Sequence, residues 1–395
     1  MRGKTTQASK RNGKTSAARI TGLAGTVAAL VALAACSGTG TGSAGSGSGH
    51  SGQAMMPRQQ QAAAANPDLD PGTAMNVAAP NFSLTNQFGQ KISLRAFRGK
   101  VVILAFTDSE CTTICPLTTS SMVAAKDLLG RAGDHVQLLG IDANPDATAR
   151  ANVMAYSRSH GMVNQWDFLT GSKAELAAAW KAYDVYVQIV KGQIDHTPAL
   201  YVIDTRGRER KLYLTTMAYT TVTQSAQLLA QEAASLLPDH PKLSSIESLS
   251  YVGGVSPAKA TTVPGARGGS VRLGPGHARL VMFFATWLQE TTDLRNRLLG
   301  LNGYARAAAA RHLPALTAID AAVTEPSPGS ARQYLAHLGA TLRYPVGLDT
   351  TGRLADGYGV QDQPWFVLVS ASGKILWKHD GWLPVSALEA AAKRA

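Results

Sequence analysis

The chain has 395 residues, 45% hydrophobic and 16% charged, so it is long enough for two or three domains with ordinary globular cores. Its formal net charge is +12, but six of its 38 Lys and Arg residues precede Cys36, a stretch without acidic residues. Removing those six leaves 32 basic residues against 26 acidic ones without a basic stripe, which argues against a nucleic-acid partner.

The N-terminus has the pattern of a secretory signal. Basic residues precede an apolar run over residues 20–35, which is shorter than the ~20 residues that a membrane-spanning helix needs. The run ends in Leu33–Ala34–Ala35–Cys36, which resembles the bacterial lipobox. This resemblance implies that Cys36 is lipidated and anchors an extracytoplasmic protein to the outer face of the cytoplasmic membrane. The alternative is an ordinary signal, or an uncleaved anchor, with an incidental cysteine.

Composition then changes twice along the chain. Residues 36–74 are rich in Gly, Ser, Ala and Gln and lack apolar periodicity, which predicts a flexible tether. Beyond Cys36 the cysteines are Cys111 and Cys115, too few for a disulfide scaffold in an oxidising compartment. We therefore expect these two thiols to be functional.

From residue 76 the sequence predicts an α/β domain. The alternation of strands and helices, with a closing hairpin and helix, favours a central mixed sheet flanked by helices. The expected elements are a hairpin over 82–94, a buried strand over 101–106, a helix ending near 129, a strand over 136–141, helices over 146–159 and 173–183, strands over 200–203 and 211–214, and a helix ending near 237.

The second part of the chain repeats this plan. The apolar run over 279–284 matches the strand before the cysteines, and 364–377 matches the region from Pro198 through the following strand. We therefore predict two divergent copies of one α/β fold, and the resemblance of each half to known families implies that both are thioredoxin-like domains. The expected organisation is a signal peptide over 1–35, the tether over 36–74, a first domain over 75–237, a linker over 238–278 that leads into the next domain, and a second domain over 279–395.

The two cysteines occupy a strand-to-helix junction. Three residues separate Cys111 from Cys115, so both lie on one face once the segment is helical. A helix N-terminus favours the thiolate, which metal binding and disulfide exchange both require. Pro116 fits the first helical turn, where its missing N–H costs little. A structural disulfide between the two cysteines is the alternative.

Residues 75–237 together resemble the Sco/SenC family of copper chaperones and thiol-disulfide proteins. The family has a strand, two cysteines separated by three residues and followed by proline, and a distant Asp-His-Ser/Thr before another strand. Here the last motif is Asp195–His196–Thr197. Thr112 stands where the family usually has proline, and Glu110 where histidine or another residue is common.

The resemblance implies copper ligation by Cys111, Cys115 and His196, and two thiolates with an imidazole suit Cu(I) and can also hold Cu(II). It implies copper delivery to the cytochrome c oxidase subunit that carries the dinuclear copper site, with an external thiol reductant. It also suggests a cis bond before Pro198. A thiol-disulfide reductase with Cys111 as the attacking thiol, and a structural lipoprotein with one Cys111–Cys115 disulfide, remain alternatives, so enzymatic activity is left open.

The second domain resembles TlpA/ResA-like thioredoxin domains through residues 284–287, which lead to that family's cysteine pair. The cysteine positions hold Leu288 and Thr291 here, and the domain has no cysteine. It therefore cannot exchange thiols. We expect a role in interaction or cover, with Trp287 and Leu288 leaving an apolar patch.

Overall fold

The computed structural model describes residues 66–243, 254–327, 329–338 and 342–395, which all belong to one compact unit that starts at Met55. The predicted signal, Cys36 and most of the tether lie outside the described residues. The tether predicted to reach residue 74 ends earlier, because Asn66 and Leu69 are already buried. Leu69 joins a core cluster, and the chain enters its first strand at Thr73.

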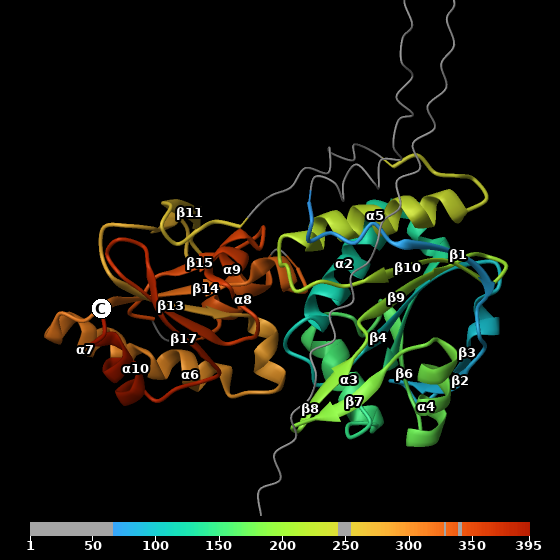
Figure 1. Cartoon of the computed structure of the whole chain (residues 1–395), viewed down its shortest axis with the longest axis horizontal. Coiled ribbons are helices and arrows are strands. Elements are labelled where there is room, and N and C mark those ends of the chain that lie inside the picture. The colour runs from blue at the N-terminus through green and yellow to red at the C-terminus, as the bar shows by residue number, and fades with distance from the viewer. Residues whose placement is uncertain (1–65, 244–253, 328, 339–341) are drawn as a thin grey trace, which may run out of the picture. The chain divides into compact units, whose positions relative to one another are not determined.

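The first half of the described chain, residues 66–243, has one mixed sheet (Figure 1). Strands β4, β5 and β6 run parallel to one another. The antiparallel pairs are β4–β9, β9–β10, β1–β10, β2–β3 and β2–β6. The strand order is β1 (Thr73–Ala78), β10 (Arg208–Leu214), β9 (Ala199–Ile203), β4 (Val101–Thr107), β5 (Val136–Asp142), β6 (Trp166–Thr170), β2 (Ser83–Asn86) and β3 (Lys91–Ser93).

Strand β4 is buried along its whole length, as its continuous apolar sequence predicts. Alternate residues face opposite sides of a strand, and here they enter two different cores. Val101, Ile103 and Ala105 pack with helices α2 (Cys115–Leu128), α3 (Arg150–Ser159) and α5 (Thr221–Leu236). Val102 and Leu104 pack on the other face, where α4 (Lys173–Ala182) lies.

The second half, residues 254–395, has a five-stranded sheet of order β15 (Val346–Leu348), β14 (Ala315–Asp320), β13 (Arg279–Phe284), β16 (Trp365–Val369) and β17 (Ile375–Asp380). Three parallel strands and an antiparallel pair repeat the order β6-β5-β4-β9-β10 of the first half. This shared topology confirms the predicted α/β class and agrees with two copies of one fold. The second half also contains β11 (Thr261–Pro264), β12 (Ser270–Leu273), α6 (Leu294–Gly300), α7 (Asn302–Arg311), α8 (Ser330–Ala336), α9 (Arg353–Tyr358), α10 (Val385–Ala392) and the 3-10 helices η3 (Thr286–Glu290) and η4 (Ala322–Thr324). The 3-10 helices η1 (Leu94–Phe97) and η2 (Gly130–His135) belong to the first half.

One core cluster has members from both halves. Leu117, at the start of α2, and Tyr219 and Val222, at the start of α5, pack with Phe283 and Leu354 of the second half. Leu117 and Tyr219 are each 1% exposed. Hydrophobic burial therefore joins the two halves at the end of α2 that carries Cys115.

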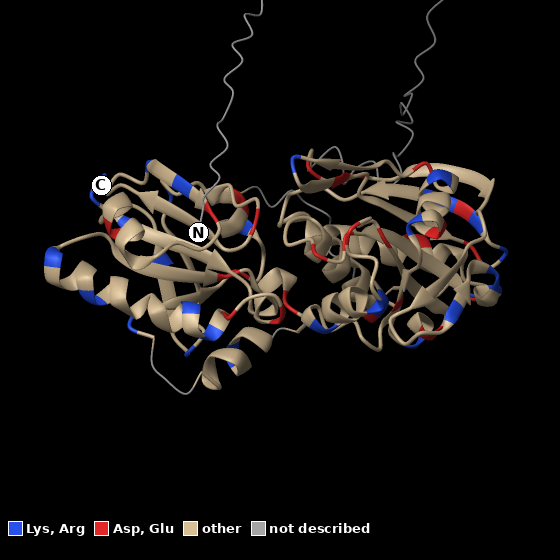
Figure 2. Ribbon diagram, turned by 90° about the horizontal axis from the view of Figure 1, so that it is seen from below, with Lys and Arg blue, Asp and Glu red and all other residues tan. Residues whose placement is uncertain are grey.

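The charged residues of the described chain are dispersed. Lys, Arg, Asp and Glu residues are scattered over both halves in the view of Figure 2. Among the described helices, none has the length and hydropathy that crossing a membrane requires.

Candidate functional site

The cysteine loop starts where β4 ends and finishes at the first turn of α2. Cys115 is the first residue of α2 and Pro116 follows it in the first turn, as predicted. Cys115 is 2% exposed, whereas Cys111 is only partly buried. Cys111 therefore lies at the surface of a pocket, and Cys115 is buried beneath it.

Polar residues at the end of the neighbouring strand β5 and just after it hold this loop. Asn144 donates from Nδ2 to Asp108 Oδ1 at 2.8 Å. The backbone N–H of Ser109 donates to Asp142 Oδ1 at 3.3 Å. Burial raises the pKa of Asp142 well above its usual range. Because β4 and β5 are parallel neighbours, their carboxyl ends meet, and one loop braces the other.

The two thiols contact each other and differ in acidity. The Cys115 backbone N–H donates to Cys111 Sγ at 3.4 Å, and Thr113 Oγ1 lies 3.3 Å from the same sulfur. The hydrogen bond from the Cys115 side chain lowers the pKa of Cys111, while burial raises the pKa of Cys115 well above its usual range. Both thiols are free in the structure, so the predicted disulfide stays a prediction for the oxidised protein.

His196 reaches the cysteines from a two-stranded hairpin formed by β7 (Val187–Val190) and β8 (Gln193–His196). Its Nε2 lies 4.0 Å from Cys115 Sγ. Its Nδ1 lies 3.1 Å from the carbonyl oxygen of Thr197, which can only accept, so Nδ1 carries the proton. Burial lowers the pKa of His196. Burial and the Thr197 contact together favour the neutral ring with the lone pair of Nε2 facing the thiol, as a metal ligand requires.

Cys111 and His196 border a pocket of about 500 Å³. Within the described chain, no three His, Cys, Asp or Glu side chains form a ready-made metal site, so a metal would have to draw His196 and the thiols closer together. The donor set nevertheless fits a soft metal ion, because two sulfurs and one imidazole nitrogen converge. Carboxylates also line the pocket, and their negative charge favours the binding of a cation. They belong to Asp108, Glu110, Asp146, Asp195 and Asp362.

Comparison with known families agrees with this arrangement. Residues 71–231 match the model of the SCO1/SenC family. This region is a SCO1/SenC domain. Over 144 residues the chain is 26% identical to the SCO1 protein homolog of Bacillus subtilis. The aligned region covers 35% of this chain and 75% of that protein. The second half of the chain lies outside the matched region.

Solved structures similar to the SCO1/SenC domain include copper-bound ScoI of Bradyrhizobium japonicum. It is 22% identical, with 41% of this chain and 99% of that chain covered and a TM-score of 0.36. Another is BsSco, described as having a disulfide switch and as a member of the Sco family of cytochrome c oxidase assembly proteins. It is 24% identical, with 40% and 95% covered and a TM-score of 0.32.

Two details of the described chain differ from the sequence-based expectations. The bond before Pro198 is trans, and the cis bond among the described residues precedes Pro364. The Thr197 N–H donates to the Tyr186 carbonyl at 3.0 Å, so the pairing of the β7–β8 hairpin extends to the residue before Pro198. The expected apolar patch is also absent, since Trp287 and Leu288 are 3% and 1% exposed. Packing within the protein buries both side chains.

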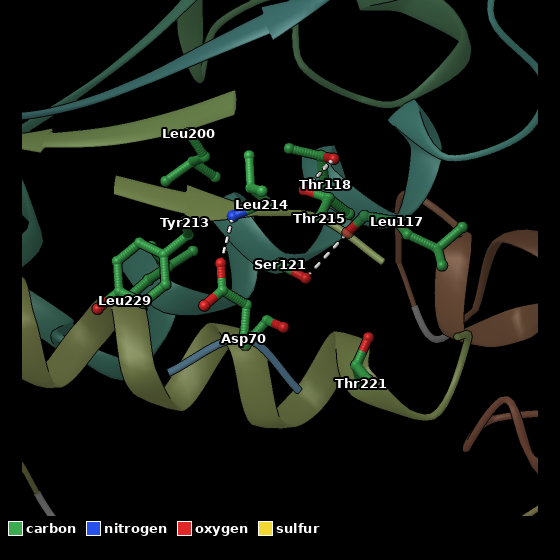
Figure 3. A pocket seen from close by; sticks show the side chains of 11 residues that line it. Asp70, Leu117, Thr118, Ser121, Leu200, Tyr213, Leu214, Thr215, Thr221 and Leu229 are labelled. Atoms are coloured by element: carbon green, nitrogen blue, oxygen red, sulfur yellow. Dashed lines mark hydrogen bonds between the residues drawn. The ribbon is translucent and has the colours of Figure 1, made fainter. Parts of the chain in front are cut away.

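A second, smaller cavity of about 20 Å³ lies on another side of α2 and contains no cysteine or histidine (Figure 3). There Asp70 accepts from the Leu214 N–H at 2.5 Å, and Thr118 donates to Thr215 at 2.8 Å. These bonds connect Asp70 to the last residue of β10 and α2 to the residue that follows β10. The cavity is structural, and the chemistry of the domain lies in the cysteine pocket.

Proposed function

We propose that this protein is a lipid-anchored, extracytoplasmic copper chaperone that binds one copper ion through Cys111, Cys115 and His196. The observation that carries the proposal is the orientation of His196. Its Nδ1–H is committed to the Thr197 carbonyl, and its Nε2 faces Cys115 at 4.0 Å. A histidine that only filled space would not need this tautomer beside a pair of reduced thiols.

Copper is the cargo of this site. Cys111 is the accessible thiol with a lowered pKa, so it is suited to make first contact with the ion. The buried Cys115 must lose its proton for the ion to be held by two thiolates, so loading releases protons. A pocket lined by carboxylates without Lys or Arg attracts a cation towards these donors.

The recipient is proposed to be the dinuclear copper centre of cytochrome c oxidase. Support comes from the SCO1/SenC domain itself and from the description of BsSco as a member of a family of oxidase assembly proteins. Anchoring through Cys36 would hold the chaperone at the outer face of the cytoplasmic membrane, where it could meet a membrane-bound oxidase. An external thiol reductant would keep the pair reduced.

The deciding experiment is an anaerobic Cu(I) titration of the reduced protein against a competing chelator. We expect one equivalent to bind, and Cys111→Ser or Cys115→Ser to abolish tight binding, because a hydroxyl does not ionise as a thiol does. The exposed His135, in η2, supplies the control His135→Ala, which should bind like the wild type. Binding no tighter than that of a simple dithiol would refute the chaperone proposal.

A thiol-disulfide reductase is the second candidate, favoured by the difference between the two thiols. The Cys111 thiolate would attack a partner disulfide and release one partner thiolate, which gives a mixed disulfide. Cys115 would then attack Cys111 Sγ, release the second partner thiolate and leave the protein as the Cys111–Cys115 disulfide. The external thiol reductant would supply the two electrons that restore the pair.

A further inference from the structure

The second half of the chain touches the cysteine pocket although it has no cysteine. The Trp287 ring, in η3, lies 5.0 Å from the ring of His160, which follows α3. Trp287 and Thr291 line a cavity of about 110 Å³ together with Cys111. The Trp287 Nε1–H donates to Thr324 Oγ1 at 3.2 Å, which fixes the indole. The segment that replaces a second active site therefore forms a wall beside Cys111.

A second contact reaches the cysteine loop itself. Asp362, in the loop before β16, lines the larger pocket together with Thr112, and burial raises the pKa of the Asp362 carboxyl while the Thr112 side chain lowers it. Thr112 directly follows Cys111. The next residue of the second half, Gln363, donates to the Tyr219 hydroxyl at 3.3 Å, so the chain that carries Asp362 is itself held.

The wall cannot swing away without exposing buried groups. The Asp356 carboxylate, in α9, accepts from the backbone N–H groups of Tyr219 and Thr220 at 2.8 and 2.9 Å and from Thr220 Oγ1 at 2.6 Å. It thereby supplies the cap at the start of α5, where Thr220 makes no side-chain cap of its own. Leu117, two residues after Cys115, is buried in the core cluster shared by the halves.

We infer that the second half is a fixed wall of the thiol site and that Asp362 is a positioning residue, which holds the cysteine loop through Thr112. The wall closes the side of Cys111 next to Trp287 and leaves the part of the pocket lined by the β7–β8 hairpin for an approaching partner. This role is independent of whether the thiols carry copper or exchange disulfides. It gives a domain without cysteines a function in partner access.

The test measures how fast Cys111 is alkylated in the reduced full-length protein. Two reagents are compared at one pH, iodoacetamide and a maleimide coupled to polyethylene glycol, with the modified residue assigned by peptide mass spectrometry. The ratio of the two rates is compared because a change in the thiolate fraction of Cys111 changes both rates by the same factor. That factor cancels in the ratio, which therefore reports steric access. Asp362→Ala and Thr112→Val each remove one polar partner of the proposed Thr112–Asp362 contact. We expect both variants to raise the bulky-to-small rate ratio by about fivefold.

Two controls separate the contact from charge and from general damage. Asp362→Asn keeps an acceptor for Thr112 and removes only the charge, so the ratio should stay within about twofold of the wild type. Asp134→Ala changes an exposed residue in η2, beyond the far end of the 14-residue α2 and hence about 20 Å from Cys115. It should leave both rates unchanged.

An unchanged ratio in both Asp362→Ala and Thr112→Val would overturn the inference. So would equal acceleration of both reagents accompanied by loss of thermal stability, since that pattern reports unfolding. Copper titration of the same variants keeps this result distinct from the proposed function. A protein that binds no copper can still show the shielding, and a protein that binds copper can fail to show it.

Discussion

His196 Nε2 lies 4.0 Å from Cys115 Sγ although 81 residues separate them in the chain. The contact joins the end of a hairpin to the first residue of a helix, two elements positioned by different parts of the sheet. Because the Thr197 carbonyl fixes the ring tautomer, the nitrogen that faces the thiol is the one with a free lone pair.

Replacing His196 separates the two proposed functions. His196→Ala removes one of three donors, so we expect the Cu(I) affinity to fall by about tenfold or more, while the cysteine pair still exchanges disulfides. Chelator competition measures the first property, and turnover of a small disulfide substrate measures the second. Full oxidase assembly in cells that carry only the variant, together with wild-type copper affinity, would contradict copper transfer through this residue.

The buried carboxyl of Glu209, in β10, should make stability depend on pH. Burial raises its pKa from 4.5 to about 7. The folded state therefore keeps a proton that the unfolded state loses, and the stability from neutral Glu209 is full below pH 4.5 and is lost as the pH rises through 7. Glu209→Gln should raise the free energy of unfolding by about 1–2 kcal/mol at pH 8, with a smaller difference at pH 4.

Urea unfolding at both pH values measures this difference. The exposed Glu290, at the end of η3, provides the control Glu290→Gln, which should show no such pH dependence. An equal effect of Glu209→Gln at pH 4 and pH 8 would show that packing, and not ionisation, accounts for the change.

The local parts of the site could be predicted from sequence, and the contacts between halves could not. The buried strand, the turn with two cysteines and the helix with Pro116 follow one another in the chain, so local patterns identify them. The β7–β8 hairpin was missed although Lys191 and Gly192 form its turn with positive φ, since Lys-Gly is a weaker hairpin signal than Asn-Gly. Asp356 and Asp362 carry no local pattern, because their partners lie more than 130 residues away.

Membrane attachment is predicted to depend on Cys36, the cysteine of the lipobox-like sequence. One residue would carry both the cleavage signal and the lipid, so Cys36→Ser should leave the protein unprocessed or released from membranes. Fractionation and mass determination of the exported protein measure this outcome. An unchanged mass with full membrane retention would exclude lipidation at Cys36, while Leu33→Ser should reproduce the defect through the recognition sequence alone.

The Asp356 cap should make the two halves unfold together. Asp356→Ala leaves the N–H groups of Tyr219 and Thr220 without their carboxylate at the start of α5, which should cost about 1–3 kcal/mol. Asp356→Asn keeps one acceptor and should cost less.

Hydrogen exchange can follow α5 and β13 separately while the urea concentration is raised. Because α5 belongs to the first half and shares a core cluster with β13, their transitions should coincide in the wild type and shift together in Asp356→Ala. Separate transitions in the wild type would mean that the halves are independent, and a wall built on the second half could then open without unfolding the first.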